Sequence, residues 1–206
     1  MTSIYKRQIM LYQLCLYKGK IDGIWGSLSK NATKEFQILT NIKVDSIYGK
    51  VTDKTLMNYY NDFINKELTE EDFKNIKYFK RKEFACRDKC GYDRINKQLL
   101  YNLDTLRYYL NYKINISSGC RCRKHNLIVG GNDNSRHYNK LVETKAVDIY
   151  NNKTKSLDYR KMVIDFWIKY MPNARYAYSD GYINSGGRKS IKSFKNMGTS
   201  IHLDVK

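Results

Sequence analysis

Apolar residues recur at helical spacing along the first third of the chain. In residues 4–17 they fall at Ile9, Leu11, Leu14, Cys15 and Tyr17, and Lys18 and Gly19 then indicate a helix end. Two further helices are predicted to open at Ser27 and Thr52. Their apolar faces carry Leu28, Ala32, Phe36 and Leu39 in the first and Leu56 and Tyr60 in the second. The pattern predicts a small three-helix unit.

An internal repeat precedes the second and third of these helices. Residues 20–26 are echoed by residues 43–49, and each copy is a polar turn that contains an aromatic residue and closes on a glycine. The second copy has Ser46 where the first has Gly23. Each copy leads directly into one of the predicted helices.

The rest of the chain mixes helical and alternating patterns. A capping box at residues 69–72 predicts a short helix near 73–76, and a stripe of leucines predicts a long helix over 97–111. Ser156 is expected to cap another helix. Strands are predicted at residues 113–117, 146–150, 175–183 and 201–205, with a loop over 184–197. We interpret the chain as an α+β protein with domains at residues 1–64 and 79–206 and a linker at 65–78.

Composition and charge narrow the class of protein. The chain has 206 residues, 42% of them hydrophobic, and no run of about 18 apolar residues that would predict a membrane span. The first residues lack the apolar run of a signal peptide, so we expect a protein made in a cytoplasm and released, if at all, without a signal. The net charge of +18 favours a polyanionic partner, either nucleic acid or an anionic cell wall. The charge is dispersed and no nucleic-acid-binding signature occurs, so nucleic acid is the less favoured partner.

Four of the five cysteines are grouped in two short segments. Cys86, Cys90, Cys120 and Cys122 fit three readings, namely a four-thiolate zinc site, reduced thiols, or a pair that oxidises after release. Reduced thiols are the default, because the spacings differ from the usual C-x-x-C. Cys15 lies in a helical apolar pattern and is predicted to be a small buried hydrophobic residue.

Two histidines and one carboxylate carry the candidate chemistry. His137, Asp148 and His202 make up the ligand set of a catalytic zinc site with an open fourth position. Zinc lowers the pKa of a bound water to about 7, which provides a nucleophile at neutral pH. Taken alone, such a trio is more often a set of unrelated surface residues.

The order of the surrounding motifs makes a metal site the favoured interpretation of the trio. Six short motifs follow one another along the chain, at residues 116–121, 125–126, 129–131, 134–137, 145–149 and 201–205. In this order they resemble the M15 zinc peptidases, the family of D-Ala-D-Ala carboxypeptidases and phage endolysins that cut peptidoglycan peptides. The resemblance covers roughly residues 73–206. It departs from the family pattern S-x-H-x-x-G-x-A-x-D, because Asp148 follows His137 by eleven residues, and we interpret the extra residues as a surface loop.

The resemblance implies roles for several residues. Zn²⁺ would bind His137, Asp148 and His202, and Arg121 would stabilise the oxyanion or hold the substrate. Ser135 would bind substrate or orient the site, with a plain turn residue as the alternative, and His125 would be structural.

The general base is the least defined of these roles. Thr199 stands where many relatives carry a catalytic Glu or Asp. Asp204 is the candidate in its place, because period-2 alternation puts it on the same strand face as His202. Its alternative role is to orient a ligand imidazole, and Glu143 and Asp180 are further candidates.

Residues 4–62 resemble the three-helix peptidoglycan-binding domain of many wall hydrolases. Asp22, Gly23 and Gly26, followed by the helix that ends in Phe36 and Gln37, carry this match. Taken one by one, these residues could instead serve only to form a turn or to fill the core.

Together the features predict an endolysin-type zinc peptidase with an N-terminal wall-binding domain. Its second domain would have a central antiparallel sheet with flanking helices. Its partners would be bacterial peptidoglycan and anionic wall polymers, reached after release from the host cytoplasm. Two rivals remain: a wall-binding protein with an inactive peptidase domain, and a nucleic-acid-binding protein with steep salt dependence.

Overall fold

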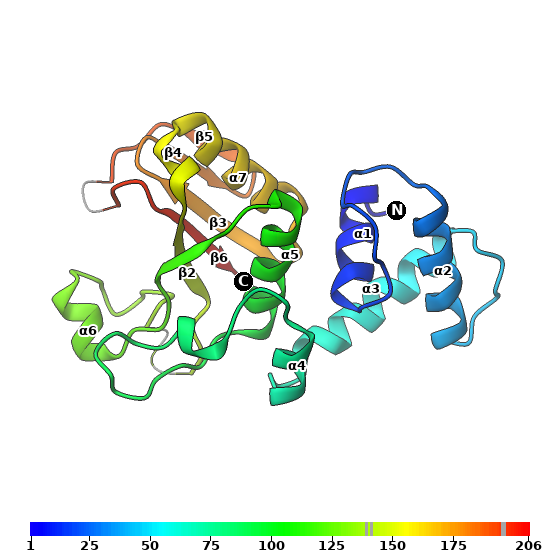
Figure 1. The fold of residues 1–206 in the computed structure, drawn as a ribbon, viewed down its shortest axis with the longest axis horizontal. Coiled ribbons are helices and arrows are strands. Elements are labelled where there is room, and N and C mark those ends of the chain that lie inside the picture. The colour runs from blue at the N-terminus through cyan, green and yellow to red at the C-terminus, as the bar shows by residue number, and fades with distance from the viewer. Residues whose placement is uncertain (139, 141, 195–196) are drawn as a thin grey trace. The chain divides into compact units, whose positions relative to one another are not determined.

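The protein is α+β, as predicted. The computed structural model describes residues 1–138, 140, 142–194 and 197–206. The chain divides into two compact units, Met1–Thr69 and Glu70–Lys206. The first unit is helical and the second contains the sheet (Figure 1). Helix α4, Glu70–Asn75, falls inside the predicted linker of residues 65–78 but belongs to the second unit.

Three helices form the first unit: α1 (Ile4–Gln13), α2 (Ser27–Leu39) and α3 (Lys50–Asn65). Thr52 does not open α3 as predicted, because the helix begins at Lys50 after the N-cap Gly49. Leu28 and Leu39 are exposed, contrary to prediction, because the buried stripe of α2 is turned toward Ser29, Thr33 and Gln37.

The end of α1 also differs from the prediction. The helix stops at Gln13, so Cys15 lies beyond it in a left-handed conformation with φ 62°. Cys15 is therefore exposed and not the buried residue that the apolar pattern predicted.

The repeated turns have equivalent hydrogen bonds. The Gln8 side chain binds the first turn through residues 22–24, donating to a carboxylate and a carbonyl oxygen and accepting from a backbone N–H. Gln37 makes the same bonds to residues 45–47 of the second turn. One buried glutamine thus holds each turn in place, and the sequence repeat is also a structural one.

Ser46 provides a test of this equivalence. Its φ is 59°, in the left-handed region that Gly23 occupies in the first turn with φ 76°. A side chain there costs about 1 kcal/mol, so Ser46→Gly is expected to raise the free energy of unfolding by roughly 0.5–1 kcal/mol in urea unfolding followed by circular dichroism. The matched change Gly23→Ala is expected to lower it, because the new Cβ would lie 2.5 Å from the ring of Tyr5. Changes of the same sign would contradict the equivalence.

The described residues of the second unit form a six-stranded antiparallel sheet with the order β1-β2-β6-β3-β4-β5. The strands are β1 (Asn115–Ser118), β2 (Ala146–Tyr150), β3 (Ala174–Ser179), β4 (Tyr182–Ser185), β5 (Arg188–Ser190) and β6 (Ile201–Val205). The helices are α5 (Lys97–Leu110), α6 (Arg123–Ile128) and α7 (Leu157–Tyr170), with short 3-10 turns at Arg81–Glu83 and Asn152–Lys155.

Two of the predicted elements are wrong in detail. The strand predicted at residues 175–183 is a hairpin of β3 and β4, because the chain turns at Asp180 and at Gly181, whose φ is 82°. The loop predicted over residues 184–197 contains β5, which pairs with β4. Residues 195 and 196 of that loop lie outside the described residues.

Helices α5 and α7 pack against the sheet and build the core of the second unit. Leu99, Leu103 and Leu106 of α5 are fully buried, as their predicted stripe requires. Ser156 caps α7 as predicted, by accepting a hydrogen bond from the N–H of Tyr159. On α7, the buried Trp167 donates from Nε1 to the carbonyl of Asp204 at 3.1 Å, which ties the helix to β6.

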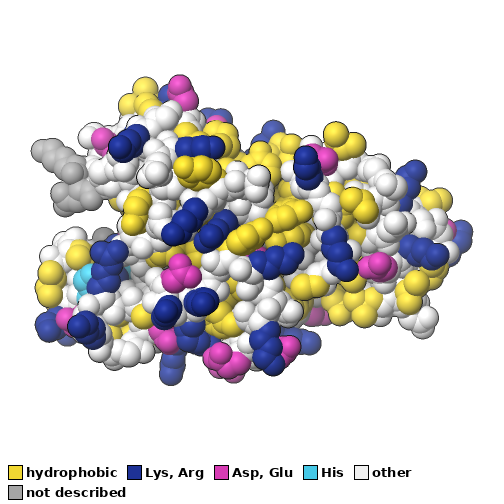
Figure 2. All heavy atoms as spheres, viewed as in Figure 1, with side chains coloured by type: hydrophobic (Ala, Val, Ile, Leu, Met, Phe, Trp, Pro, Cys, Tyr) yellow, Lys and Arg dark blue, Asp and Glu magenta, His cyan; other side chains and the backbone are white. Residues whose placement is uncertain are grey.

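The surface carries the positive charge in dispersed form. Lys and Arg side chains are spread over the visible face with Asp and Glu among them (Figure 2). Within the described part of the chain, none of the helices combines the length and apolar character needed to cross a membrane.

Asp104 on α5 anchors the start of the second unit. Its Oδ1 accepts from the backbone N–H groups of Lys77 at 3.0 Å and Tyr78 at 2.9 Å. Burial raises the pKa of this carboxyl to about 6. The folded chain therefore keeps a proton that the unfolded chain releases near pH 4, so Asp104 lowers stability as pH rises from about 4 to about 6.

Asp104→Asn keeps the acceptor oxygen and removes the charge. We expect the variant to be more stable than the wild type at pH 7 by roughly 1–3 kcal/mol, and the difference to shrink toward zero near pH 4. Urea unfolding of both proteins at the two pH values measures it. Because the comparison is between proteins that differ at one carboxyl, the other titrating groups cancel. A difference that does not change with pH would contradict the role of burial.

Candidate metal centre

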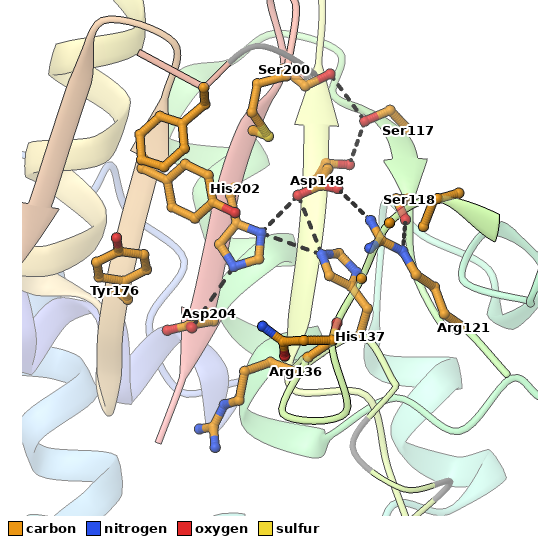
Figure 3. A pocket seen from close by; sticks show the side chains of 18 of the residues that line it. Ser117, Ser118, Arg121, Arg136, His137, Asp148, Tyr176, Ser200, His202 and Asp204 are labelled. Atoms are coloured by element: carbon orange, nitrogen blue, oxygen red, sulfur yellow. Dashed lines mark hydrogen bonds and ion pairs between the residues drawn. The ribbon is translucent and has the colours of Figure 1, made fainter. Parts of the chain in front are cut away.

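The pairing of β2 with β6 creates the site. Asp148 lies directly opposite His202 in this register, and residues opposite one another in an antiparallel pair share a face. His137 reaches the same place from the loop before β2. The three side chains converge in a cleft of about 730 Å³ (Figure 3). The structure thus brings together the three residues that the sequence proposed as metal ligands.

The facing atoms of the trio are spaced as metal ligands are. His202 Nδ1 lies 2.8 Å from Asp148 Oδ1 and 3.3 Å from His137 Nε2, which in turn lies 3.4 Å from Asp148 Oδ1. Tetrahedral zinc with bonds of 2.0–2.2 Å places its ligand atoms about 3.3–3.5 Å apart. One oxygen and two imidazole nitrogens are also donors that zinc prefers. The residues therefore fit a zinc ion with little movement.

Polar contacts on the far side of each ring, a hydrogen bond for His137 and an ion-pair contact for His202, favour the nitrogen that faces this point. His137 donates from Nδ1 to the carbonyl of Gly119 at 2.8 Å, which leaves the lone pair on Nε2. His202 has Nε2 3.8 Å from Asp204 Oδ2, which leaves Nδ1 as its ligand atom. The two imidazoles thus present different nitrogens to one centre.

The charges of the trio favour a cation at this point. Burial opposes ionisation of Asp148, but the imidazoles of His137 and His202 outweigh it and hold the pKa of this carboxyl well below its usual range. Burial lowers the pKa of His137, whereas hydrogen bonds to Asp148 and Asp204 outweigh burial and raise the pKa of His202. A buried carboxylate flanked by two imidazoles therefore retains either a proton or a metal ion.

Arg121 holds the second oxygen of Asp148. Its Nη2 donates to Asp148 Oδ2 at 3.0 Å, and its Nε donates to Ser118 Oγ at 2.9 Å. The backbone N–H of Arg121 also donates to the carbonyl of His137 at 3.0 Å. The guanidinium is fixed at the wall of the cleft, beside the face of Asp148 that is turned away from the histidines.

Asp204 lies behind His202. It is fully buried, and Arg175 donates to both of its oxygens, with Nε 3.2 Å from Oδ1 and Nη2 on Oδ2. It faces the nitrogen of His202 that is turned away from Asp148. This geometry favours the alternative role of orienting the imidazole, and its role as a general base stays a prediction.

The other residues singled out in the sequence lie around this centre. Ser135 lines the same cleft, but Glu143 and Asp180 do not. Glu143 accepts from Asn96 Nδ2 at 2.7 Å, and Asp180 accepts from Ser193 and from the N–H of Phe194. Within the described residues, Asp148 and Asp204 are the carboxylates that line the cleft.

Part of the inserted segment is also defined. Residues 139 and 141 lie outside the described residues. At the end of the insertion, Thr144 Oγ1 donates to the carbonyl of His137 at 2.9 Å, so the segment returns to the metal centre.

Sequence reasoning missed three supports of the centre. Tyr178 on β3 lies opposite His202 in register and stacks on its ring, with centroids 4.5 Å apart. The other two are Arg175 and the carbonyl of Gly119. The alternation of tyrosines at 176 and 178 could have indicated that both rings lie on one face of a strand. Nothing in the sequence distinguishes Arg175 from the other Lys and Arg residues, of which there are 38 in all.

Fold and site together define an α+β protein with a buried two-histidine, one-aspartate cluster suited to a divalent metal. Residues 77–166 match the family model Peptidase M15. The match spans less than half of the chain; it includes Arg121, His137 and Asp148 and stops before β3 and β6. It supports the M15 peptidase family, whose members are generally zinc-dependent, and suggests a peptidase. None of the curated proteins matches the chain.

Asp204→Asn separates the two roles of Asp204. The change keeps the shape but removes the charge that faces His202 Nε2, so we expect zinc to bind about 10- to 100-fold more weakly. Competition of the metal-free protein with a chromophoric chelator measures the affinity. Asp165→Asn is the matched control, because Asp165 on α7 is also hydrogen bonded but lies outside the cleft. Unchanged zinc affinity together with lost turnover would instead support a general base.

Proposed function

We propose that this protein is a zinc metallopeptidase that hydrolyses a peptide bond in the stem peptides or cross-links of peptidoglycan. The observation that carries the proposal is the convergence of His137 Nε2, Asp148 Oδ1 and His202 Nδ1 on one point in an open cleft. The Peptidase M15 match supports the same reaction class.

When bound, zinc would activate a water and polarise the peptide carbonyl. The chain's own residues supply the rest of the chemistry. Arg121 fixes Asp148 as a one-oxygen ligand, and its planar, permanently charged guanidinium is placed to stabilise the negative charge that develops on the carbonyl oxygen. Asp204 and Tyr178 hold His202 in one orientation. Because these contacts exist before substrate binds, little reorganisation is required during the reaction.

The charge of the cleft supports an anionic substrate. Four arginines line it, at positions 87, 121, 136 and 175, against the two aspartates Asp148 and Asp204. Asp148 faces the two histidines, and Asp204 is already paired with Arg175. The excess of positive charge favours a peptide that carries free carboxylates, and the stem peptides of peptidoglycan are of this kind.

The first unit is proposed to bind the cell wall. Its two equivalent turns and the first residues of the helices that follow them expose apolar side chains at matching positions: Ile24 and Leu28 in the first copy, and Ile47 and Val51 in the second. Exposed apolar residues that repeat in this way are typical of a contact surface, because a purely structural repeat would bury them. A wall-binding unit joined to a wall peptidase is the arrangement of an endolysin, and we propose that class.

The test is digestion of purified peptidoglycan, with mass analysis of the soluble products and sedimentation of the protein with the wall. The wild type is expected to release fragments with new amino and carboxyl termini, and His202→Ala is expected to release none while still sedimenting with the wall. Chelation is expected to abolish release and added zinc to restore it. Asp165→Asn serves as the active control, since Asp165 lies outside the cleft.

Two outcomes would contradict the proposal. Unchanged wall from folded, zinc-loaded wild type would leave a wall-binding protein with an inactive site. Undiminished release by His202→Ala would place the reaction elsewhere in the chain.

A further inference from the structure

A second group of metal-binding side chains lies in the same unit. Cys86 and Cys90 belong to the loop between the 3-10 turn at Arg81–Glu83 and α5, and Cys122 is the N-cap of α6. Their three sulfur atoms all lie within 4.8 Å of one another. His125, in the first turn of α6, has Nδ1 3.4 Å from the sulfur of Cys86. Segments far apart in the sequence thus bring three thiols together, and the imidazole of His125 lies beside Cys86 but outside the group whose ligand atoms are all within 4.8 Å of one another.

These spacings suit a tetrahedral metal ion. With Zn–S bonds of about 2.3 Å and Zn–N bonds of about 2.0 Å, sulfurs would lie about 3.8 Å apart and a sulfur and a nitrogen about 3.5 Å apart. The distance between Cys86 Sγ and His125 Nδ1 already has this value. The sulfurs need to move by at most about 1 Å, and the ring of His125 has to turn toward the other two sulfurs. Three cysteines and one histidine are a common ligand set of structural zinc sites.

Backbone hydrogen bonds prepare the sulfurs for negative charge. The N–H of Cys122 donates to Cys86 Sγ at 3.3 Å, and the N–H of His125 donates to Cys122 Sγ at 3.4 Å. Such bonds stabilise thiolates, which are the form that binds metal. Two of the three sulfurs therefore have a backbone donor turned toward them.

We propose that Cys86, Cys90, Cys122 and His125 form a structural zinc site that is separate from the catalytic centre. Binding replaces the three thiol protons by the metal ion and leaves His125 as a neutral ligand. The four protein ligands would fill the coordination sphere, so this site has no open position for water or substrate.

Cys120 is not part of the site, although its sequence position would suggest it. Its thiol is buried and contacts the carbonyl of Arg94 at 3.5 Å. His125, which lies 3.4 Å from Cys86 Sγ, is the fourth ligand of the proposed site, which has three thiolates and an imidazole in place of the four thiolates considered from the sequence.

The site would stabilise one wall of the catalytic cleft. It would cross-link the loop of Cys86 to the segment that begins at Gly119, whose carbonyl orients His137, and continues through Arg121. This segment has little regular structure of its own. A metal cross-link there reduces the freedom of the unfolded chain and of the loop, as structural zinc does in small domains.

The test is the metal content of the full chain together with its cobalt spectrum. Wild type, Cys90→Ser, His202→Ala and the control Cys15→Ser are purified and analysed for zinc. Wild type and Cys15→Ser are expected to hold about two zinc ions per chain, and each of the other variants about one. Cys90 and Cys15 are both exposed, so their substitution is expected to leave the fold intact.

Cobalt distinguishes which ion is lost. Thiolate ligands give Co²⁺ a charge-transfer band in the near ultraviolet that nitrogen and oxygen ligands lack. The band is expected in wild type and in His202→Ala and is expected to be absent from Cys90→Ser. This readout does not depend on peptidase activity, so the second site and the proposed function can fail separately.

Three results would overturn the second site. They are a wild type without the thiolate band, thiols at positions 86, 90 and 122 that alkylate at the same rate before and after chelation, and a disulfide between two of them in the native protein.

Discussion

The antiparallel pairing of β2 with β6 is the constraint on which the candidate metal centre depends. It places a carboxylate directly opposite an imidazole on the same face of the sheet, and it does so through backbone hydrogen bonds that have no chemical role themselves. A shift of one residue in this register would turn Asp148 or His202 toward the helices. The buried alternate residues, Val147 on β2 and Leu203 on β6, prevent that shift because they would then be exposed at the cleft.

Two arginines compensate the buried charges that the strand register brings together. Two carboxylates and two imidazoles lie buried within one cluster, and unpaired charges in such surroundings would be strongly destabilising. Arg121 pairs with Asp148 on one side, and Arg175 pairs with Asp204 on the other. Each arginine therefore serves the fold, by compensating a buried charge, and serves the site, by fixing the orientation of a ligand.

The sequence predicts the local features of this arrangement better than the distant ones. Period-2 alternation correctly places His202 and Asp204 on one face, and the leucine stripe correctly predicts α5. The alternation cannot show that β6 lies between β2 and β3, because strand order depends on contacts between residues far apart in the chain. For the same reason Tyr178 and Arg175 were missed, since they reach His202 and Asp204 only through the neighbouring strand.

The cysteine cluster is a second case in which spacing in the sequence does not show which side chains meet in the fold. Spacing alone groups Cys120 with Cys122, because they are two residues apart. The two side chains of Cys120 and Cys122 point to different surroundings, one to the interior and one to the start of α6. The fourth partner that we propose, His125, lies three residues after Cys122, at a spacing that the first turn of a helix makes close.

The cleft therefore has two walls that are held by different means. One wall is the sheet, where backbone pairing positions Asp148 and His202. The other is the segment from Gly119 to His137, which packs so closely that a Cβ at Gly119 would lie 2.6 Å from the carbonyl oxygen of Phe84. The N–H of Cys120 also donates to that carbonyl at 2.8 Å, and the proposed metal cross-link between Cys86 and Cys122 would strengthen this attachment. The distance between the walls determines whether His137 reaches the other two ligands, so the proposed structural zinc would act on catalysis through the position of that one imidazole.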